Sequence, residues 1–210
     1  MKKTIITLLI FLPFLLNAQP VFQPVLKSYF RTHPFDGTFS AFIKSMQQDP
    51  WFKIEEYSRR TDTSFFFLTG TYKNFNPFHY PAKEVRLIVA EQLLEHTDSL
   101  KTLDTIINIQ LLGIADATEN SRTEVVKEYT RFQKKYASLF WKSSYQKGDY
   151  EGRLATEINH FFIYPYSISP ISVVWGHMET KEYAFIITIR CKVKQNIADV
   201  ILNPGEAPRF

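Results

Sequence analysis

This chain contains little cysteine and little glycine for its length. It holds one Cys and seven Gly among 210 residues. A single Cys cannot form an intramolecular disulfide, so an apolar core has to stabilise the fold. The few glycines form no phosphate-cradling loop of the kind that nucleotide enzymes use. These shortages argue against a disulfide-stabilised scaffold and against a nucleotide-dependent enzyme.

Several other signals are missing as well. The formal net charge is only +4, from 25 basic and 21 acidic residues, so no nucleic-acid partner is expected. The chain contains no Asn-x-Ser/Thr glycosylation site. It also lacks a Gly-x-Ser-x-Gly elbow, a His-Glu-x-x-His pair and an EF-hand loop. We therefore expect a bacterial protein without a metal site or a cofactor, and we assign no catalytic residue.

The N-terminal residues have the pattern of a secretory signal peptide. Lys2 and Lys3 precede an apolar run over residues 5–16, and a small residue, Ala18, follows. The run is shorter than the ~20 residues that a membrane-spanning helix needs, and no later stretch is long enough. We expect cleavage near Ala18/Gln19, a periplasmic or secreted mature chain, and no transmembrane anchor in it.

The first half of the chain is predicted to form one helix and four strands. An irregular lead-in is expected over residues 19–37, which contain Pro20, Pro24, Pro34 and Gly37. A helix should begin at Thr38 and end before Pro50, with one apolar face made of Phe39, Phe42, Ile43 and Met46. Strands are predicted at Phe52–Arg60, Phe65–Lys73, Glu84–Leu94 and Leu103–Ile114.

The second half repeats this order of elements. The spacing of Ser121 and Glu124 predicts a capping box at the start of a second helix. Its apolar stripe is Val125, Tyr129, Phe132, Tyr136 and Leu139 or Phe140. Its other side carries Lys127, Arg131, Lys134 and Lys135, either as an ordinary solvated face or as an anion-binding patch. Strands follow at Phe140–Lys147, Tyr150–Ile163, Ile171–Met178 and Tyr183–Lys194, before a loose tail at 201–210.

These patterns predict an α+β fold with two helices packed on one or two antiparallel sheets. The halves span residues 38–116 and 117–200. Each is a helix followed by four strands, which is compatible with a tandem repeat. Residue identity between the halves is low, so the matching order is compatible with chance as well.

The histidines offer no clear site. His160 and His177 fall within predicted strands, where half-buried sheet positions explain them better than metal ligation does. Glu157 and His160 are three residues apart, so on a strand they point to opposite faces. Cys191 falls on an apolar strand face, where a Cys acts as a small hydrophobic residue.

Aromatic residues make up 16% of the chain, and two proline-bounded loops carry a share of them. Rigid aromatic rings on loops make good contact residues, because they bury area at a small entropic cost. The alternative is that the rings tuck under their own loops and close the ends of the sheet. The candidate ligand-binding residues are Phe75, Phe78, His79, Tyr80, Tyr164 and Tyr166.

The function that fits these observations is an exported, non-enzymatic binding module of the bacterial cell envelope. Its partner would be a protein or a cell-envelope glycan. Two alternatives stay open. One is a small periplasmic hydrolase that uses His79, His160 or His177 with a nearby carboxylate. The other is a scaffold component of an envelope complex.

Overall fold

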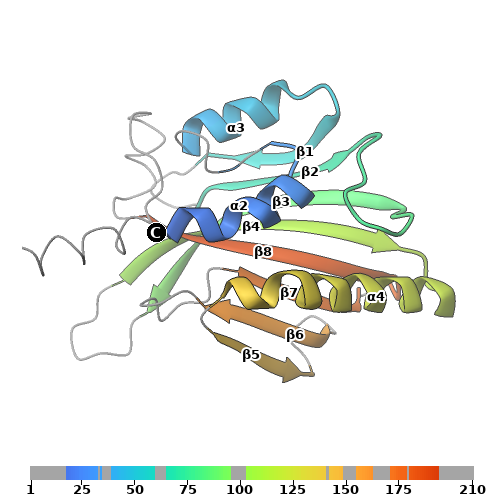
Figure 1. Ribbon diagram of the computed structural model, residues 1–210. Helices are drawn as coiled ribbons and strands as arrows, with labels where there is room; N and C mark the ends of the chain where they lie inside the picture. The colour runs from blue at the N-terminus through green and yellow to red at the C-terminus, as the bar shows by residue number, and fades with distance from the viewer. Residues whose placement is uncertain are drawn as a thin grey trace, which may run out of the picture.

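The protein is built on one antiparallel sheet of eight strands (Figure 1). The computed structural model describes residues 18–32, 34, 39–59, 65–95, 103–140, 142–148, 155–162, 171–178 and 180–193. The strands are β1 (Phe52–Ser58), β2 (Phe67–Tyr72), β3 (Glu84–Glu95), β4 (Leu103–Ala115), β5 (Lys142–Lys147), β6 (Ala155–Phe162), β7 (Ile171–His177) and β8 (Tyr183–Val193). Their order in the sheet is β1-β2-β3-β4-β8-β7-β6-β5.

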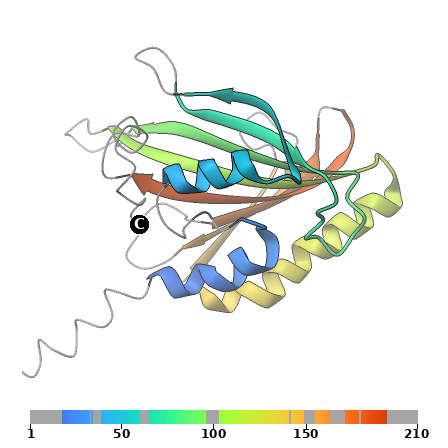
Figure 2. The ribbon, with the colours of Figure 1, turned by 90° about the horizontal axis from the view of Figure 1, so that it is seen from above.

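The helices lie on one face of this sheet (Figure 2). They are α2 (Ala18–Tyr29), α3 (Phe39–Gln48) and α4 (Glu119–Tyr136), with a short 3-10 turn, η2 (Ala137–Leu139), after α4. α4 is the longest and packs across β4, β8 and β7, whereas α3 contacts β1 near the opposite edge. None of the helices in the described ranges combines the length and the apolar character that a membrane crossing requires.

The two halves of the chain meet at the centre of the sheet. β4 pairs along its length with β8, from Thr105 opposite Val193 to Ala115 opposite Tyr183. Each half therefore ends in a central strand and places its first strand at an outer edge. The predicted α+β class with an antiparallel sheet is confirmed, and the sheet is continuous across the described strands.

The core between the helices and the sheet is largely aromatic. The predicted face of α3 is buried as expected, and so are Val125, Tyr129, Phe132 and Tyr136 of α4. Phe132 contacts Tyr29, Phe161 and Phe185, with ring centroids about 6 Å apart, and so joins α2, β6 and β8. In the last strand, Phe185, Ile187 and Ile189 alternate along the chain and face this core.

The other face of the sheet carries a smaller apolar cluster. It consists of Leu112, Ile114, Ile158, Val174, Ala184 and Ile186. Polar residues adjoin it: Ser172 and Thr188 are buried, and Arg190 donates a hydrogen bond to the Ser172 hydroxyl at 2.9 Å. His160 pairs in register with Ser172 on this face.

Two local predictions were wrong. Residues 19–37 are not irregular throughout, because α2 occupies Ala18–Tyr29 with Pro24 inside it. Burial of Val25, Leu26 and Tyr29 explains why the helix forms despite the hydrogen bond that proline removes. The cap of α4 is Thr118, three residues before the predicted Ser121, and its hydroxyl accepts from the Ser121 amide at 3.1 Å.

Other predictions concern residues outside the described ranges. These are residues 1–17 of the predicted signal peptide, which was expected to end at Ala18, and the tail at 201–210. They stay predictions.

Candidate functional site

The loop between β2 and β3 is anchored on the core by two of the predicted contact residues. Phe78 and Tyr80 are only 6% and 3% exposed, and their rings stack with centroids 5.4 Å apart. The Tyr80 hydroxyl donates to the carbonyl of Gly113 at 2.7 Å. A Cβ atom at position 113 would collide with both rings, so this approach requires glycine. Burial leaves little of either ring for a ligand to contact.

Asn76 holds the loop in shape. Its side-chain amide donates to the Tyr80 carbonyl at 2.6 Å, and its side-chain oxygen accepts from the Phe78 amide at 3.1 Å. Phe75 is half-buried against Tyr72, at a centroid distance of 5.0 Å. Of the predicted aromatic residues in this loop, all three are thus engaged with the core.

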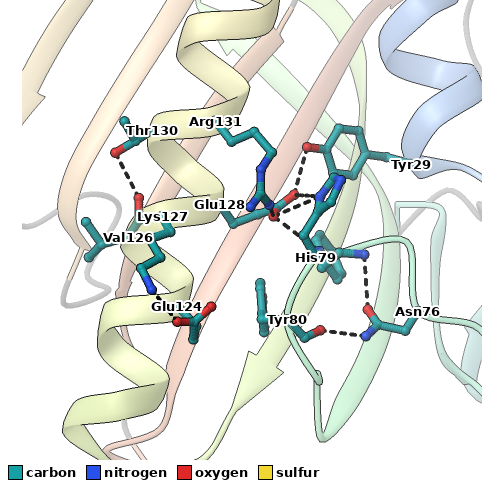
Figure 3. Close-up of polar contacts among 11 residues, drawn as sticks. Tyr29, Asn76, His79, Tyr80, Glu124, Val126, Lys127, Glu128, Thr130 and Arg131 are labelled. Carbon is teal, nitrogen blue, oxygen red and sulfur yellow. Dashed lines mark hydrogen bonds and ion pairs between the residues drawn. The ribbon is translucent and has the colours of Figure 1, made fainter.

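His79 lies between the two anchors and turns toward α4 (Figure 3). Its Nδ1 atom is 3.1 Å from Oε2 of Glu128, and its backbone amide donates to the same oxygen at 3.2 Å. The side chain of His79 remains 56% exposed, whereas that of Glu128 has no exposed surface. The imidazole is therefore oriented by a buried carboxylate while its outer edge faces solvent.

Glu128 is shared by three parts of the chain. Besides His79, it accepts from the Tyr29 hydroxyl of α2 at 2.9 Å and from Nη1 of Arg131 at 2.5 Å. We call Tyr29, His79, Glu128 and Arg131 the Glu128 cluster. Burial, together with the charge of Glu128, raises the pKa of Tyr29, so the hydroxyl stays protonated and donates. These donors compensate for the cost of burying a carboxylate.

The solvent-facing side of α4 forms a shallow hollow of about 680 Å³. We call it the α4 hollow; the described residues that line it are Arg122, Thr123, Val126, Lys127, Thr130, Arg131, Lys134 and Lys135. Acidic neighbours neutralise this surface only in part. Lys127 pairs with Glu124 at 2.6 Å and Arg122 with Glu119 at 2.6 Å, and both cations keep about half of their side-chain surface exposed.

The Glu128 cluster borders this hollow. Arg131 belongs to both, because it binds Glu128 with one guanidinium nitrogen and also lines the hollow. Lys135 lies over the Tyr136 ring at 4.9 Å from its centroid. The arrangement concentrates positive charge on a concave surface and can bind anionic groups.

The structure brings only part of the predicted site together. His79 is placed beside α4, whereas Tyr164 and Tyr166 lie outside the described residues. His177 is in ring contact with Tyr183, at 4.4 Å, and His160 lies on the opposite sheet face. Within the described ranges, no group of three or more His, Cys, Asp or Glu side chains is placed to hold a metal ion.

Glu128 is the functional candidate that the sequence reading missed. It stands in the apolar stripe of α4, three residues after Val125 and one before Tyr129. An acidic residue at a stripe position is an anomaly that could have been noticed. Its partners could not, since Tyr29 and His79 are 99 and 49 residues away along the chain.

Comparisons with known proteins give no relative from which a role could be transferred. No protein family, no curated protein and no solved structure matches this chain.

Proposed function

We propose that this protein is an exported, non-enzymatic binding module of the bacterial cell envelope that captures an anionic partner in the α4 hollow. The observation that carries the proposal is the lining of that hollow, to which α4 contributes five exposed cations: Arg122, Lys127, Arg131, Lys134 and Lys135. The partner is an acidic protein or an acidic envelope glycan.

Electrostatics supports capture of an extended polyanion. The lining cations occupy positions 122 to 135, which spans about 20 Å along a helix at about 1.5 Å per residue. Charges at such spacing act together on a chain-like ligand, and they attract it over roughly the 10 Å Debye length of 0.1 M salt. The apolar face of α4 is already buried in the core, so the helix has only its charged face to offer.

The N-terminal residues support export. A charged start, an apolar run over residues 5–16 and a small residue at Ala18 fit a cleaved signal peptide and a periplasmic or secreted product. Cell fractionation with N-terminal sequencing of the mature protein tests this part. A mature chain that begins near Gln19 is expected, and an intact precursor in the cytosol would contradict it.

Charge reversal tests the binding surface. We expect the purified protein to bind polygalacturonate, poly-L-glutamate or both, and to bind more weakly as salt increases. The double variant Lys127→Glu/Lys134→Glu should lose at least about tenfold in affinity for whichever polyanion binds, because rim charges drive such encounters. Isothermal titration calorimetry measures the affinity of each variant for the polyanion.

The matched control is Lys44→Glu/Lys53→Glu, which makes the same change in net charge on exposed residues of α3 and β1. It should bind like the wild type. Equal losses in both double variants would point to net charge alone and would contradict a site on α4.

A hydrolase is the second candidate, and the His79–Glu128 contact favours it. A carboxylate 3.1 Å from Nδ1 holds the His79 imidazole in a fixed orientation, as the buried carboxylate does in acyl-transfer enzymes. Chromogenic carboxylic and phosphoric esters are the probes. Turnover that is lost in His79→Ala, with folding intact, would establish this candidate over the binding module.

We also propose that residues 38–116 and 117–200 are two copies of one unit, a helix with four strands. Support comes from the position of β4 and β8 as equivalent final strands at the centre of the sheet. Superposing the Cα atoms of β1–β4 on those of β5–β8 tests the idea, because equivalent strands must match in order and direction.

A further inference from the structure

Where α4 meets the outer strands, three buried polar atoms have no hydrogen-bond partner among the residues that the structure describes. They are the Tyr129 hydroxyl of α4, the Asn159 side-chain oxygen of β6 and the Trp175 indole nitrogen of β7. All three residues are more than nine-tenths buried. Gln133 is a polar neighbour of the Tyr129 hydroxyl, but no contact of hydrogen-bond geometry forms. Folded proteins satisfy the large majority of such atoms, so a group of three calls for an explanation.

Strand register places these residues beside an exposed aromatic ring and a carboxylate. Tyr145 of β5 pairs with Asn159, and Glu157 of β6 pairs with Trp175. This is the helix-covered face, since Phe161, two residues beyond Asn159, belongs to the main core. Tyr145 is 58% exposed, because β5 is the last strand of the sheet. We call these five residues, Tyr129 included, the Tyr145 cluster.

The members of the cluster also act on one another electrostatically. The pKa of Tyr145 is raised by desolvation and by the nearby Glu157. The pKa of Tyr129 is raised by burial and then by Glu157 and Tyr145. The two phenols and the carboxylate therefore influence one another's protonation.

The Tyr145 cluster adjoins the α4 hollow. Arg122 lines the hollow, and its guanidinium carbon is 5.8 Å from the centroid of the Trp175 ring. A ligand that lies along the cations of α4 therefore reaches the cluster at the Arg122 end. Tyr145, which is 58% exposed, is the most accessible member of the cluster.

The chemistry of this cluster matches a sugar ring. A pyranose has an apolar C–H face that stacks on an aromatic ring, and hydroxyl groups that both donate and accept hydrogen bonds. The cluster offers the exposed Tyr145 ring for stacking and the half-buried Glu157 carboxylate as an acceptor, while the Trp175 N–H and the Asn159 oxygen are buried without partners among the described residues. Binding sites of small polar molecules commonly combine aromatic walls with a few fixed polar groups.

From these observations we infer that the anionic partner is an acidic polysaccharide, whose acid groups bind the α4 hollow and whose sugar ring binds the Tyr145 cluster. The inference rests on the proposed function, since it names the partner of the same surface. An acidic polypeptide would pair with the cations of the α4 hollow equally well. Its carboxylates would not use the Tyr145 ring for stacking, nor the unpaired amide, phenol and indole groups beside that ring.

The test compares three polymers with the purified protein by isothermal titration: polygalacturonate, poly-L-glutamate and neutral dextran. Polygalacturonate should bind at least about tenfold more tightly than poly-L-glutamate, and dextran should bind weakest. Tyr145→Ala should weaken polygalacturonate binding about fivefold to tenfold and leave poly-L-glutamate unchanged, because stacking serves only the sugar. Phe65→Ala, another exposed aromatic residue, is the control and should change neither.

A second variant distinguishes a loss of binding from a loss of folding. Tyr129→Phe removes an unpartnered hydroxyl, so the free protein should be as stable as the wild type or more stable. It should still bind polygalacturonate more weakly.

The outcomes separate the two levels of the proposal. Equal binding of both polyanions, with no effect of Tyr145→Ala or Tyr129→Phe, would overturn the polysaccharide inference while the anion-binding function stands. Absence of binding to either polyanion would overturn both.

Discussion

Helices α3 and α4 occupy comparable places but differ in their outer faces. Both precede a run of four strands, both lie on the same face of the sheet, and both bury an aromatic stripe in one core. α3 has ten residues, of which Lys44 alone is charged. α4 has eighteen residues, and its outer face lines a hollow rich in Lys and Arg.

The difference between α3 and α4 distinguishes the features that a helix needs to cover this sheet from those that it does not need. α3 shows that a short helix with a plain polar side is enough to cover one end of this sheet. The charge on the outer face of α4 is therefore not needed to cover the core. The same holds for Glu128, a buried charge that has no counterpart in α3.

The largest expected effect tests whether the buried faces of α3 and α4 contribute equally to the stability of the core. Phe132→Ala in α4 and Phe42→Ala in α3 each remove a ring that is at most 2% exposed. Each should lower the free energy of unfolding by about 3–5 kcal/mol, through lost burial and a cavity. Urea denaturation measures both. A small loss in only one helix would show that this helix contributes little to the core.

The next effect concerns the buried charge that only α4 carries. Glu128→Gln should lower the free energy of unfolding by about 1–3 kcal/mol, because Tyr29 and His79 lose a charged acceptor. Glu124→Gln, which affects only the surface pair with Lys127, should stay within about 0.5 kcal/mol of the wild type. Equal losses would mean that the Glu128 cluster is no more important than a surface ion pair.

The smallest expected effect concerns an ion pair that joins residues 38–116 to residues 117–200 and involves none of the helices. Nζ of Lys83, just before β3, is 2.6 Å from Glu182, just before β8. This hydrogen bond holds the pKa of Glu182 below its ordinary 4.5 and the pKa of Lys83 above its ordinary 10.5. The ion pair is therefore intact between the lowered pKa of Glu182 and the raised pKa of Lys83. It is lost as pH falls through the lowered pKa or rises through the raised one.

Thermal unfolding of Glu182→Gln and the wild type, followed across pH, measures this contact. The melting temperature of the variant should be slightly lower near neutral pH, and the difference should vanish in strong acid. A difference that persists in acid would mean that Glu182 acts through packing rather than through its charge.

Much of the fold could be predicted because its signals are local. The period of Phe39, Phe42, Ile43 and Met46 defines α3, and the alternation in β8 defines which residues face the core. α2 was missed because Pro20 and Pro24 indicate a break, whereas burial against distant elements decides the outcome. Local patterns also could not reveal that β4 and β8 join the halves into one sheet.

The candidate site was less predictable, for a physical reason. Sequence patterns indicated a loop with His79 and a basic side of α4, but not that they are adjacent. Their adjacency depends on Glu128, which gains its donors only when α2, the loop and α4 have packed together. Phe78 and Tyr80 resemble contact residues in the sequence, and only Gly113 on a distant strand makes room for them in the core.

The pairing of β4 with β8 has a consequence for how the chain reaches its final state. β4 is rich in isoleucine and leucine, and one of its edges has no partner until residues 183–193 are in place. A growing or truncated chain therefore exposes an unpaired edge of an apolar strand, which promotes aggregation. The complete sheet needs this last strand, so a partner that shields the β4 edge during synthesis or transport would increase the yield of native protein.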